Sequence, residues 1–468
     1  MKIEQIYTGC LAQGAYYIES NGEVAIIDPL REVQPYIDRA NADKAKIKYI
    51  FETHFHADFV SGHVTLSEKT GAPIVFGPQA TPTYKVVVAT DGQVFQLGEI
   101  TITCLHTPGH TMESSCYLLK DKNGKDYALF SGDTVFLGDV GRPDLAQKAA
   151  HMTQEQLAGT LFDSIRTKIM PLADDVIIYP AHGAGSACGK NLSKETVGTI
   201  GDQKANNYAL RANMTREEFI AEVTDGLLPP PAYFPMNVKL NKEGYENVET
   251  IINNAKALSA KDFEIVANET NALILDVRNE NDFAKGHIPN SIFIGINGTF
   301  APWVGALILD FKQPILLITP EDKEEETIKR LARVGYDATI GYLDGGIESW
   351  EKAGFELDSV NCISAETLED KLKEEITVFD VRKSGEFIAE HLNEAPSTPL
   401  DFLNDHLSEF PKDKEFYLFC AGGYRSMIAA SILKARGYDN VINVNGGFNA
   451  IKKTGIKTTN FVCPSTLK

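Results

Sequence analysis

Short apolar runs alternate with polar turns over the first half of the chain. Six of these runs have the length and the β-branched or aromatic content of strands, namely Val24–Ile27, Ile47–Phe51, Ile74–Phe76, Ile100–Leu105, Tyr127–Phe130 and Val176–Tyr179. Helical spacing of apolar residues falls between them, at Val33–Ala42, Gly62–Thr70 and Thr153–Lys168. Strands with interspersed helices predict a layered α/β domain.

The pattern breaks around Leu227–Asn241, where prolines gather. Pro229, Pro230, Pro231 and Pro235 cannot continue a helix, so this segment is predicted to be an extended connector.

A unit of roughly 100 residues then occurs twice. Both copies carry an apolar run ending in Asp-Val-Arg, then a His, and finally a Gly-Gly pair; the sets are Asp276, Arg278, His287 and Gly345-Gly346, then Asp380, Arg382, His391 and Gly446-Gly447. Alternating strands and helices in each copy predict parallel strands joined by crossover helices. The expected domains are therefore 1–228, a connector at 229–254, and two small domains at 255–358 and 359–468.

Composition narrows the functional class. The 468 residues include 43% hydrophobic and 23% charged residues, with a formal net charge of −19, and no Lys/Arg-rich stretch offers a basic face for nucleic acid. No apolar stretch is long enough for a membrane helix, and Met1–Gln5 leads into no signal core, so a cytoplasmic protein is expected. Seven scattered cysteines without a CxxC favour reduced thiols.

Residues that bind metals follow four of the predicted strands. They are His54, His56 and Asp58 after Ile47–Phe51, His110 after Ile100–Leu105, Asp133 after Tyr127–Phe130, and His182 after Val176–Tyr179. Imidazole and carboxylate groups suit zinc, iron and manganese. Over roughly residues 1–225 the chain resembles the metallo-β-lactamase superfamily in this His-x-His-x-Asp loop and the later His, Asp and His, which implies an αββα sandwich.

Phe59 departs from that superfamily pattern. Two-metal members carry a ligating His directly after the Asp, but Phe59 cannot ligate, which makes a hydroxide-bridged metal pair doubtful. The chain also resembles ETHE1-like persulfide dioxygenases, and this resemblance implies one Fe(II) per N-terminal domain on His54, His110 and Asp133, a facial triad with open positions. The same resemblance implies that His56, Asp58 and His182 are neighbours that orient the ligands. It also implies that Arg142 binds the anionic part of a thiol substrate.

A cysteine loop marks the second copy of the repeat. Cys420 follows the strand Phe416–Phe419 and precedes a helix, where backbone N–H groups and the helix dipole favour a thiolate, and Arg425 adds positive charge. The two copies resemble the rhodanese family over roughly residues 255–468. In the first copy the corresponding strand Ile315–Thr319 runs into Pro320–Lys323 without a cysteine, so this copy is expected to be inactive and to act as a spacer or docking surface. Cys188, close after His182, is a candidate neighbour of the metal pocket.

The fold class is thus expected to be α/β, with an N-terminal metallo-β-lactamase sandwich and two rhodanese-like domains. The resemblances imply a persulfide dioxygenase that converts a low-molecular-weight thiol persulfide and O2 to sulfite and thiol, coupled through Cys420 to sulfite and thiosulfate in sulfide detoxification. They also imply a homo-oligomer, a dimer or a tetramer. Two alternatives stay open, a dinuclear zinc thioester hydrolase of the glyoxalase II kind and a sulfur carrier without oxygenase activity. The sequence does not distinguish glutathione, coenzyme A or bacillithiol as the thiol, nor does it set the direction of sulfur flow.

Overall fold

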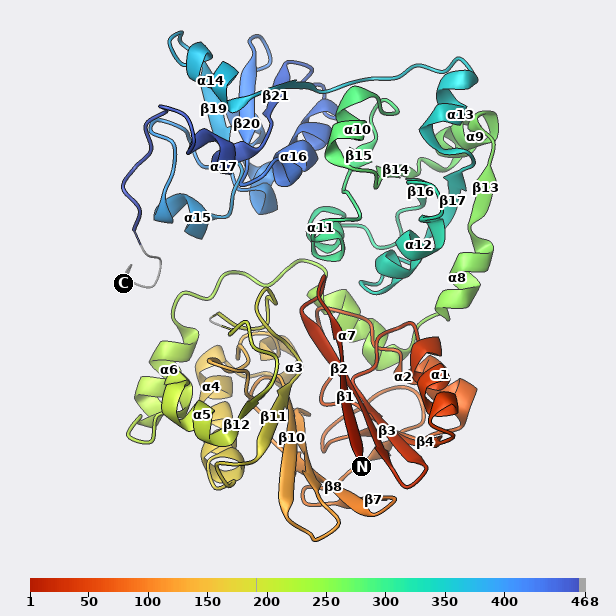
Figure 1. The fold of residues 1–468 in the computed structure, drawn as a ribbon, viewed down its shortest axis with the longest axis vertical. Helices are drawn as coiled ribbons and strands as arrows, with labels where there is room; N and C mark the ends of the chain where they lie inside the picture. The colour runs from red at the N-terminus through yellow and green to blue at the C-terminus, as the bar shows by residue number, and fades with distance from the viewer. Residues whose placement is uncertain (191, 463–468) are drawn as a thin grey trace. The chain divides into compact units, whose positions relative to one another are not determined.

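The computed structural model describes residues 1–190 and 192–462 and divides into two compact units. The first unit comprises Met1–Val248 with Leu331–Gly335, and the second comprises Glu249–Arg330 with Tyr336–Lys468 (Figure 1). No helix in the described part of the chain is long and apolar enough to cross a membrane.

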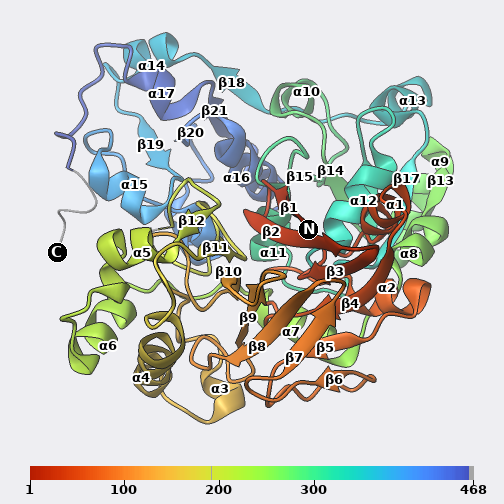
Figure 2. The same cartoon turned by 60° about the horizontal axis from the view of Figure 1, so that its bottom comes forward.

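Two six-stranded sheets form the centre of the first unit. The first sheet has the order β1-β2-β3-β4-β5-β6, with β1 Lys2–Thr8, β2 Gln13–Ser20, β3 Glu23–Ile27, β4 Lys46–Phe51, β5 Ile74–Phe76 and β6 Val87–Val88. The second has the order β12-β11-β10-β9-β8-β7, with β7 Val94–Leu97, β8 Ile100–His106, β9 Ser115–Lys120, β10 Asp126–Gly132, β11 Ile177–Pro180 and β12 Gly198–Thr199. Strands β3 to β6 are parallel, and Figure 2 shows β3, β4 and β5 side by side.

Helices cover the outer face of each sheet. α1 (Gln34–Ala42) and α2 (His63–Thr70) lie on the first sheet, while α4 (Gln154–Ser164), α5 (Ile200–Asn206) and α6 (Arg216–Thr224) lie on the second, with the short α3 at Gln147–Ala150 (Figure 1). Alternating side chains feed separate cores: in β4, Phe51 joins the core between the sheets and Ile50 joins the core under α1. The predicted αββα sandwich is therefore confirmed.

The proline-rich segment is not the extended connector that its composition predicts. It contains α7 (Phe234–Glu243) and is followed by α8 (Val248–Asn254). Pro235 stands in the first turn of α7, where the missing N–H has no intrahelical partner to lose. The prediction was wrong because proline excludes a helix interior but not a helix start.

The second unit contains both copies of the repeat, each built on a parallel sheet. The first copy has the strand order β13-β17-β16-β14-β15, with β13 Lys256–Leu258, β14 Leu273–Asp276, β15 Ile292–Phe293, β16 Ile315–Ile318 and β17 Thr339–Leu343. Its helices are α9 Ala260–Thr270, α10 Glu280–Lys285, α11 Phe300–Leu307, α12 Glu324–Ala332 and α13 Gly346–Lys352. The crossover topology predicted for this copy is confirmed.

The second copy has four parallel strands in the order β18-β21-β20-β19. They are β18 Asn361–Ile363, β19 Thr377–Asp380, β20 Phe416–Phe419 and β21 Val441–Val444. Its helices are α14 Ala365–Lys371, α15 Ser384–Ala389, α16 Tyr424–Lys434 and α17 Gly447–Ile451, with a 3-10 segment at Leu400–Glu409. Buried β20 thus leads through the Cys420 loop into buried α16.

Candidate functional site

Strand ends bring the predicted metal ligands to one place. β8, β10 and β11 run in the same direction in the second sheet, so His110, Asp133 and His182 follow their carboxyl ends, while His54 follows β4 of the first sheet. Gly109 and Gly132 precede two of these ligands with φ of 138° and 52°, a region that favours glycine.

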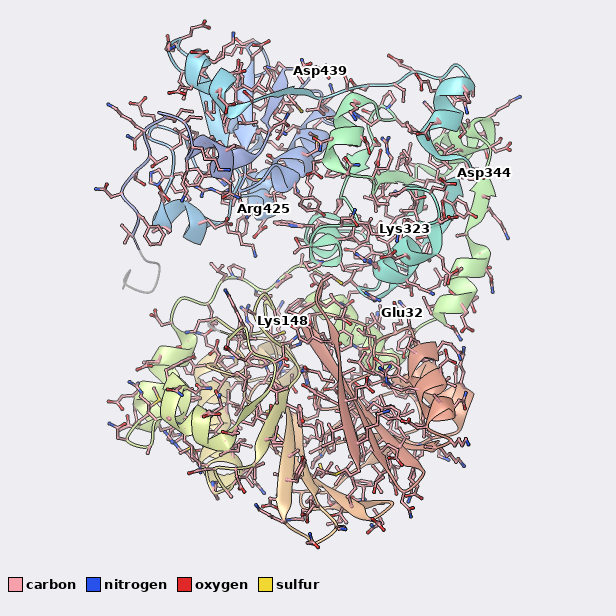
Figure 3. All side chains as sticks on the ribbon, viewed as in Figure 1. Glu32, Lys148, Lys323, Asp344, Arg425 and Asp439 are labelled. Atoms are coloured by element: carbon pink, nitrogen blue, oxygen red, sulfur yellow. The ribbon has the colours of Figure 1, made fainter. Side chains whose placement is uncertain are left out.

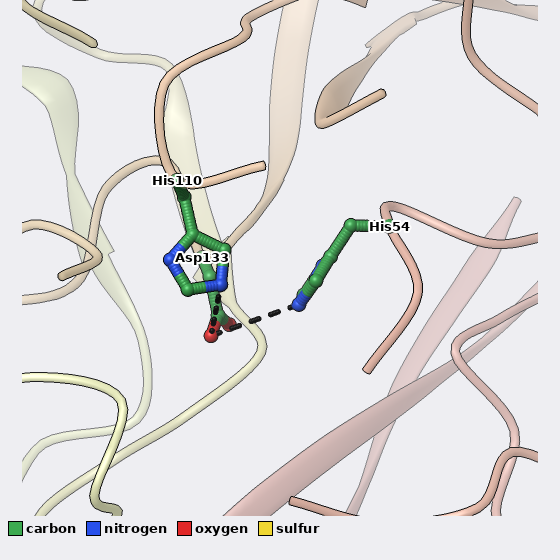
Figure 4. Close-up of side chains that lie close together, drawn as sticks. All are labelled: His54, His110 and Asp133. Carbon is green, nitrogen blue, oxygen red and sulfur yellow. Dashed lines mark ion pairs between the residues drawn. The ribbon is translucent and has the colours of Figure 1, made fainter. Parts of the chain in front are cut away.

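The first group of ligand atoms centres on one oxygen of Asp133. The Nε2 atoms of His54 and His110 lie 3.8 Å and 3.4 Å from Asp133 Oδ2, and the two imidazole rings are nearly perpendicular at 87° (Figure 4). All three side chains are at most 2% exposed, and their ligand atoms lie within 4.8 Å of one another. The arrangement offers two imidazole nitrogens and one carboxylate oxygen to a common point.

Hydrogen bonds on the far side of each imidazole fix which nitrogen faces this point. His110 Nδ1 lies 2.9 Å from the carbonyl oxygen of Arg142, and His182 Nδ1 lies 3.2 Å from that of Ala12, so both Nδ1 atoms donate. His54 Nδ1 lies 2.9 Å from Thr53 Oγ1, which itself donates to Asp28. Each Nε2 is left with its lone pair free, as a metal ligand requires.

Burial and electrostatics keep His54 neutral. Desolvation, with His56, His110 and His182 nearby, holds the pKa of His54 well below its ordinary value. His56 is different. Burial alone would lower its pKa, but Asp28, with Glu52 and Asp58, raises it to about 9. His56 Nε2 lies 3.1 Å from Asp28 Oδ1, which places that nitrogen in an ion pair.

A second group of donors faces the other oxygen of Asp133. His182 Nε2 lies 3.6 Å from Asp133 Oδ1 and 3.4 Å from Asp58 Oδ2. Burial raises the pKa of Asp58, although His182 opposes this. Phe59, fully buried, packs against His56 with ring centroids 4.4 Å apart and ring planes tilted by 33°, and it offers no ligand atom.

The donors fit a divalent metal ion. Both oxygens of Asp133, Asp58 Oδ1 and His182 Nε2 are buried and have no hydrogen-bond partner among the described residues. Burying unpaired carboxylate oxygens is costly, and a cation between them removes this cost.

Two predicted neighbours of the metal pocket have different surroundings. The thiol of Cys188 lies within 4.8 Å of ligand atoms of Asp133 and His182, and burial, with Asp58 and Asp133, raises its pKa well above the ordinary value. Arg142 is 6% exposed and directs its guanidinium to Asp144 and to the carbonyls of residues 187 and 228. These contacts hold the guanidinium in place, and the anion contact expected of Arg142 stays a prediction.

Sequence reasoning missed two residues that support the metal loop. Asp28, after β3, accepts hydrogen bonds from Thr53 N and Oγ1, both at 2.8 Å. Asn241 of α7 donates to the carbonyls of His56 and Phe59 at 2.8 Å, and its oxygen accepts from Ser61 N. Asp28 stands at a strand end like the ligands, so that signal was present; Asn241 carried none.

The cysteine loop of the second copy forms a separate constellation. Cys420 is buried, and its Sγ accepts from Gly423 N at 3.1 Å and from Ser426 Oγ at 3.6 Å. Gly423 has φ of 111°, which only glycine adopts readily. Arg425 (Figure 3) is paired with Glu386 of α15, with Nη2 2.9 Å from Oε1. Burial would raise the pKa of Glu386, but Arg425 lowers it overall.

In the first copy, a side-chain hydrogen bond spans the loop that corresponds to the Cys420 loop. Thr319 follows β16 and donates to Glu324 Oε1 at 2.9 Å, so a carboxylate of α12 occupies the helix start. The six described cysteines of the chain are free thiols, none of them in this loop; Cys463 lies outside the described residues.

The two parts of the chain that carry these groups of residues match two known protein families. A model of the metallo-beta-lactamase superfamily matches residues 8–182, and a model of the rhodanese-like domain matches residues 259–353 and 364–454. A metallo-beta-lactamase structure from Staphylococcus aureus subsp. aureus COL is 32% identical with a TM-score of 0.66, covering 73% of this chain and 98% of that one. The chain belongs to the metallo-beta-lactamase superfamily, and it carries two rhodanese-like domains after the metal domain.

Two further similar proteins carry different names. The structure of ETHE1 from Myxococcus xanthus is 27% identical with a TM-score of 0.44, covering 52% of this chain and 98% of that one. A hydroxyacylglutathione hydrolase from Tolumonas auensis is 32% identical over 171 residues, which are 36% of this chain and 60% of that relative.

Proposed function

We propose that the protein is a non-heme Fe(II) persulfide dioxygenase coupled to rhodanese-type sulfur transfer. In the first reaction a low-molecular-weight thiol persulfide, O2 and water yield the free thiol, hydrogen sulfite and a proton. In the second, Cys420 carries a sulfane sulfur as a persulfide, which it either takes from thiosulfate with release of sulfite or passes to sulfite to form thiosulfate. The free cysteines fit a reducing cytoplasm, and sulfide detoxification is the process that would use both reactions.

The observation that carries the proposal is the donor set around Asp133. His54, His110 and Asp133 supply three donors, the number found in the two-His-one-carboxylate iron oxygenases. Phe59 takes the place of a ligand for a second metal. A bound Fe(II) would supply open positions at which O2 and the persulfide sulfur meet. The chain's own part is to hold the imidazole of His54 neutral, to orient both imidazoles and to keep bulk water out of a buried site.

The Cys420 loop supports the second half of the proposal. Sulfur transfer from thiosulfate breaks its S–S bond, joins the sulfane sulfur to the Cys420 thiolate as a persulfide, and releases sulfite. Gly423 N–H and Ser426 Oγ face Sγ and would stabilise the anion. Arg425 adds positive charge near the loop.

Metal content and O2 uptake test the dioxygenase half. Protein purified without air should bind about one iron per chain, as expected for a single facial triad, and should consume O2 only when a persulfide such as glutathione persulfide is added. His110→Ala should lose O2 uptake and keep sulfur transfer from thiosulfate to cyanide, whereas Cys420→Ala should do the reverse. Zinc-loaded protein as isolated, with no persulfide-dependent O2 uptake after iron loading, would refute the proposal.

Two other functions make different predictions. A dinuclear thioester hydrolase is favoured by the convergence of Asp58 and His182 on Asp133 and by the likeness to hydroxyacylglutathione hydrolase. It requires two metals per chain and turnover of S-lactoylglutathione. A sulfur carrier that only binds metal requires sulfur transfer with no O2 uptake under any metal loading.

A further inference from the structure

The helix that carries the Cys420 loop is held by the copy that lacks a cysteine. Tyr424, Ser431 and Lys434 are seven and three residues apart and share one face of α16. Tyr424 Oη donates to Gly295 O at 2.7 Å, Ser431 Oγ accepts from Phe293 N at 3.0 Å, and Lys434 Nζ lies 3.1 Å from Asp358 Oδ2. The first copy therefore contacts α16 along its whole length, from its first residue to its last turn.

The ring of Tyr424 packs closely against the first copy. It packs edge-on against Phe293, with ring centroids 5.9 Å apart, and lies over Gly295 and Gly298. A Cβ added at Gly298 would overlap the ring, and one at Gly295 would lie 3.1 Å from it. Burial raises the pKa of the Tyr424 hydroxyl, so it stays protonated and donates its hydrogen bond throughout the physiological range.

Tyr424 directly follows the residue that contacts the sulfur. Gly423 has φ of 111°, and its N–H points at Cys420 Sγ. The other side of the loop is held by α17, because Phe448 N donates to Cys420 O at 2.7 Å. The two ends of the contact thus have separate anchors: α17 of the second copy holds Cys420, and the first copy holds Gly423 through Tyr424.

We infer that Tyr424 is a positioning residue for Cys420, and that the cysteine-free copy serves the active copy by clamping it. The clamp aligns the Gly423 N–H with Sγ and so favours the thiolate of Cys420, the form that reacts, over the thiol. The inference extends the proposed sulfur transfer, but the clamp itself rests on contacts that hold whatever reaction Cys420 performs.

Alkylation of Cys420 tests the clamp without relying on turnover. Tyr424→Phe removes only the hydrogen bond to Gly295. Gly298→Ala disturbs the ring from the first copy, far from Cys420 along the chain. Tyr438→Phe is the matched control, because Tyr438 Oη also donates to a backbone carbonyl, that of Leu407, at 2.7 Å. Iodoacetamide labelling of the full chain across pH, resolved by peptide mass mapping, gives the rate at Cys420.

Both test variants should label Cys420 about three- to tenfold more slowly at pH 7, as expected when a hydrogen bond to a charged group is weakened. Their labelling profiles should move to higher pH, while Tyr438→Phe and wild type coincide. Labelling of Cys10, in the other unit, should be the same in all four proteins. Thermal unfolding confirms that each variant is folded at the labelling temperature.

Two results would overturn the inference: unchanged Cys420 labelling in folded Tyr424→Phe and Gly298→Ala, or an equal loss in Tyr438→Phe, which would indicate general loosening. Thiosulfate-to-cyanide transfer separates this outcome from the proposed function. If wild type transfers no sulfur while the variants label slowly, the clamp stands and the sulfur-transfer proposal fails.

Discussion

Replacing Asp28 by Asn should weaken metal binding although Asp28 is not among the proposed ligands. Asp28 accepts three contacts: Thr53 N at 2.8 Å, Thr53 Oγ1 at 2.8 Å and His56 Nε2 at 3.1 Å. Asn has the same size, and it tolerates the left-handed backbone of Asp28, with φ of 50°, at least as well. The substitution therefore changes the hydrogen bonds and the charge while sparing the backbone.

The chemical effect reaches His54 through the Thr53 hydroxyl. In the native chain this hydroxyl donates to Asp28 and so accepts from His54 Nδ1–H, which leaves Nε2 free for a metal. The amide nitrogen of Asn would donate to the hydroxyl instead. The hydroxyl would then donate to His54 Nδ1 and favour the tautomer whose Nε2 carries the proton, which blocks ligation.

The size of the loss follows from these contacts. Asn keeps an acceptor for Thr53 N and His56, but one charge-assisted hydrogen bond reverses, at a cost of about 1.5–3 kcal/mol. This corresponds to about a 10- to 100-fold loss of metal affinity, the range typical of residues that support metal-bound histidines.

Anaerobic competition for Fe(II) or Zn(II) against a chromophoric chelator measures the dissociation constant. Asp126→Asn is the control, since Asp126 is a partly exposed acid that pairs with Lys120 in the same domain. The tautomer reasoning would be refuted if folded Asp28→Asn protein bound the metal with an affinity within about twofold of wild type. Loss of a residue that supports a metal-bound histidine is expected to cost about 10- to 100-fold.

Three further substitutions test other parts of the two sites. Phe59→His should raise the metal content from about one toward two ions per chain, as measured by elemental analysis, because it restores the missing ligand type; a content that stays at one would show that Phe59 does not limit the second site. Asn241→Leu should lower the free energy of unfolding by about 2–4 kcal/mol, since it leaves two carbonyls and one N–H of the metal loop unpaired; an unchanged melting temperature would contradict this. Glu386→Gln should raise the ratio of iodoacetate to iodoacetamide labelling of Cys420 about two- to fivefold, because it removes a negative charge that pairs Arg425; a constant ratio would mean that Arg425 does not act on anions at this loop.

Local pattern was enough to predict the layers of the fold and the convergence of the metal donors. Strand β4 alternates between two cores and then ends at His54, and both facts are readable from a short window of sequence. The same rule of polar residues after buried strands would have found Asp28. It predicts a common edge because parallel strands end together.

Tertiary contacts explain what local pattern missed. Asn241 supports the metal loop from a helix about 180 residues later in the chain, and Glu386 reaches Arg425 from α15. Neither residue lies in a motif, so only the folded chain reveals its partner. The helix α7 itself was missed because the three prolines at 229–231 were read together with Pro235, which stands at a permitted position in the first turn.

The two copies of the repeat separate residues that maintain the fold from residues that perform chemistry. Asp276 pairs with Arg278 in the first copy as Asp380 pairs with Arg382 in the second, with the same 2.6 Å contact. His287 stacks on Phe283 as His391 does on Phe387, with rings 3.9 Å apart in both. Because the copy without a cysteine retains these contacts, they maintain the fold and cannot be counted as support for sulfur transfer.

Support for sulfur transfer comes from the Cys420 loop alone. At the equivalent place in the first copy, Thr319 donates a hydrogen bond to Glu324. The first copy has no cysteine in its own loop, yet its sheet and core are intact, so it can act through its shape. Holding α16 through Tyr424 is such a task, since it requires the backbone of Gly295 and Gly298 in the right place and no reactive group.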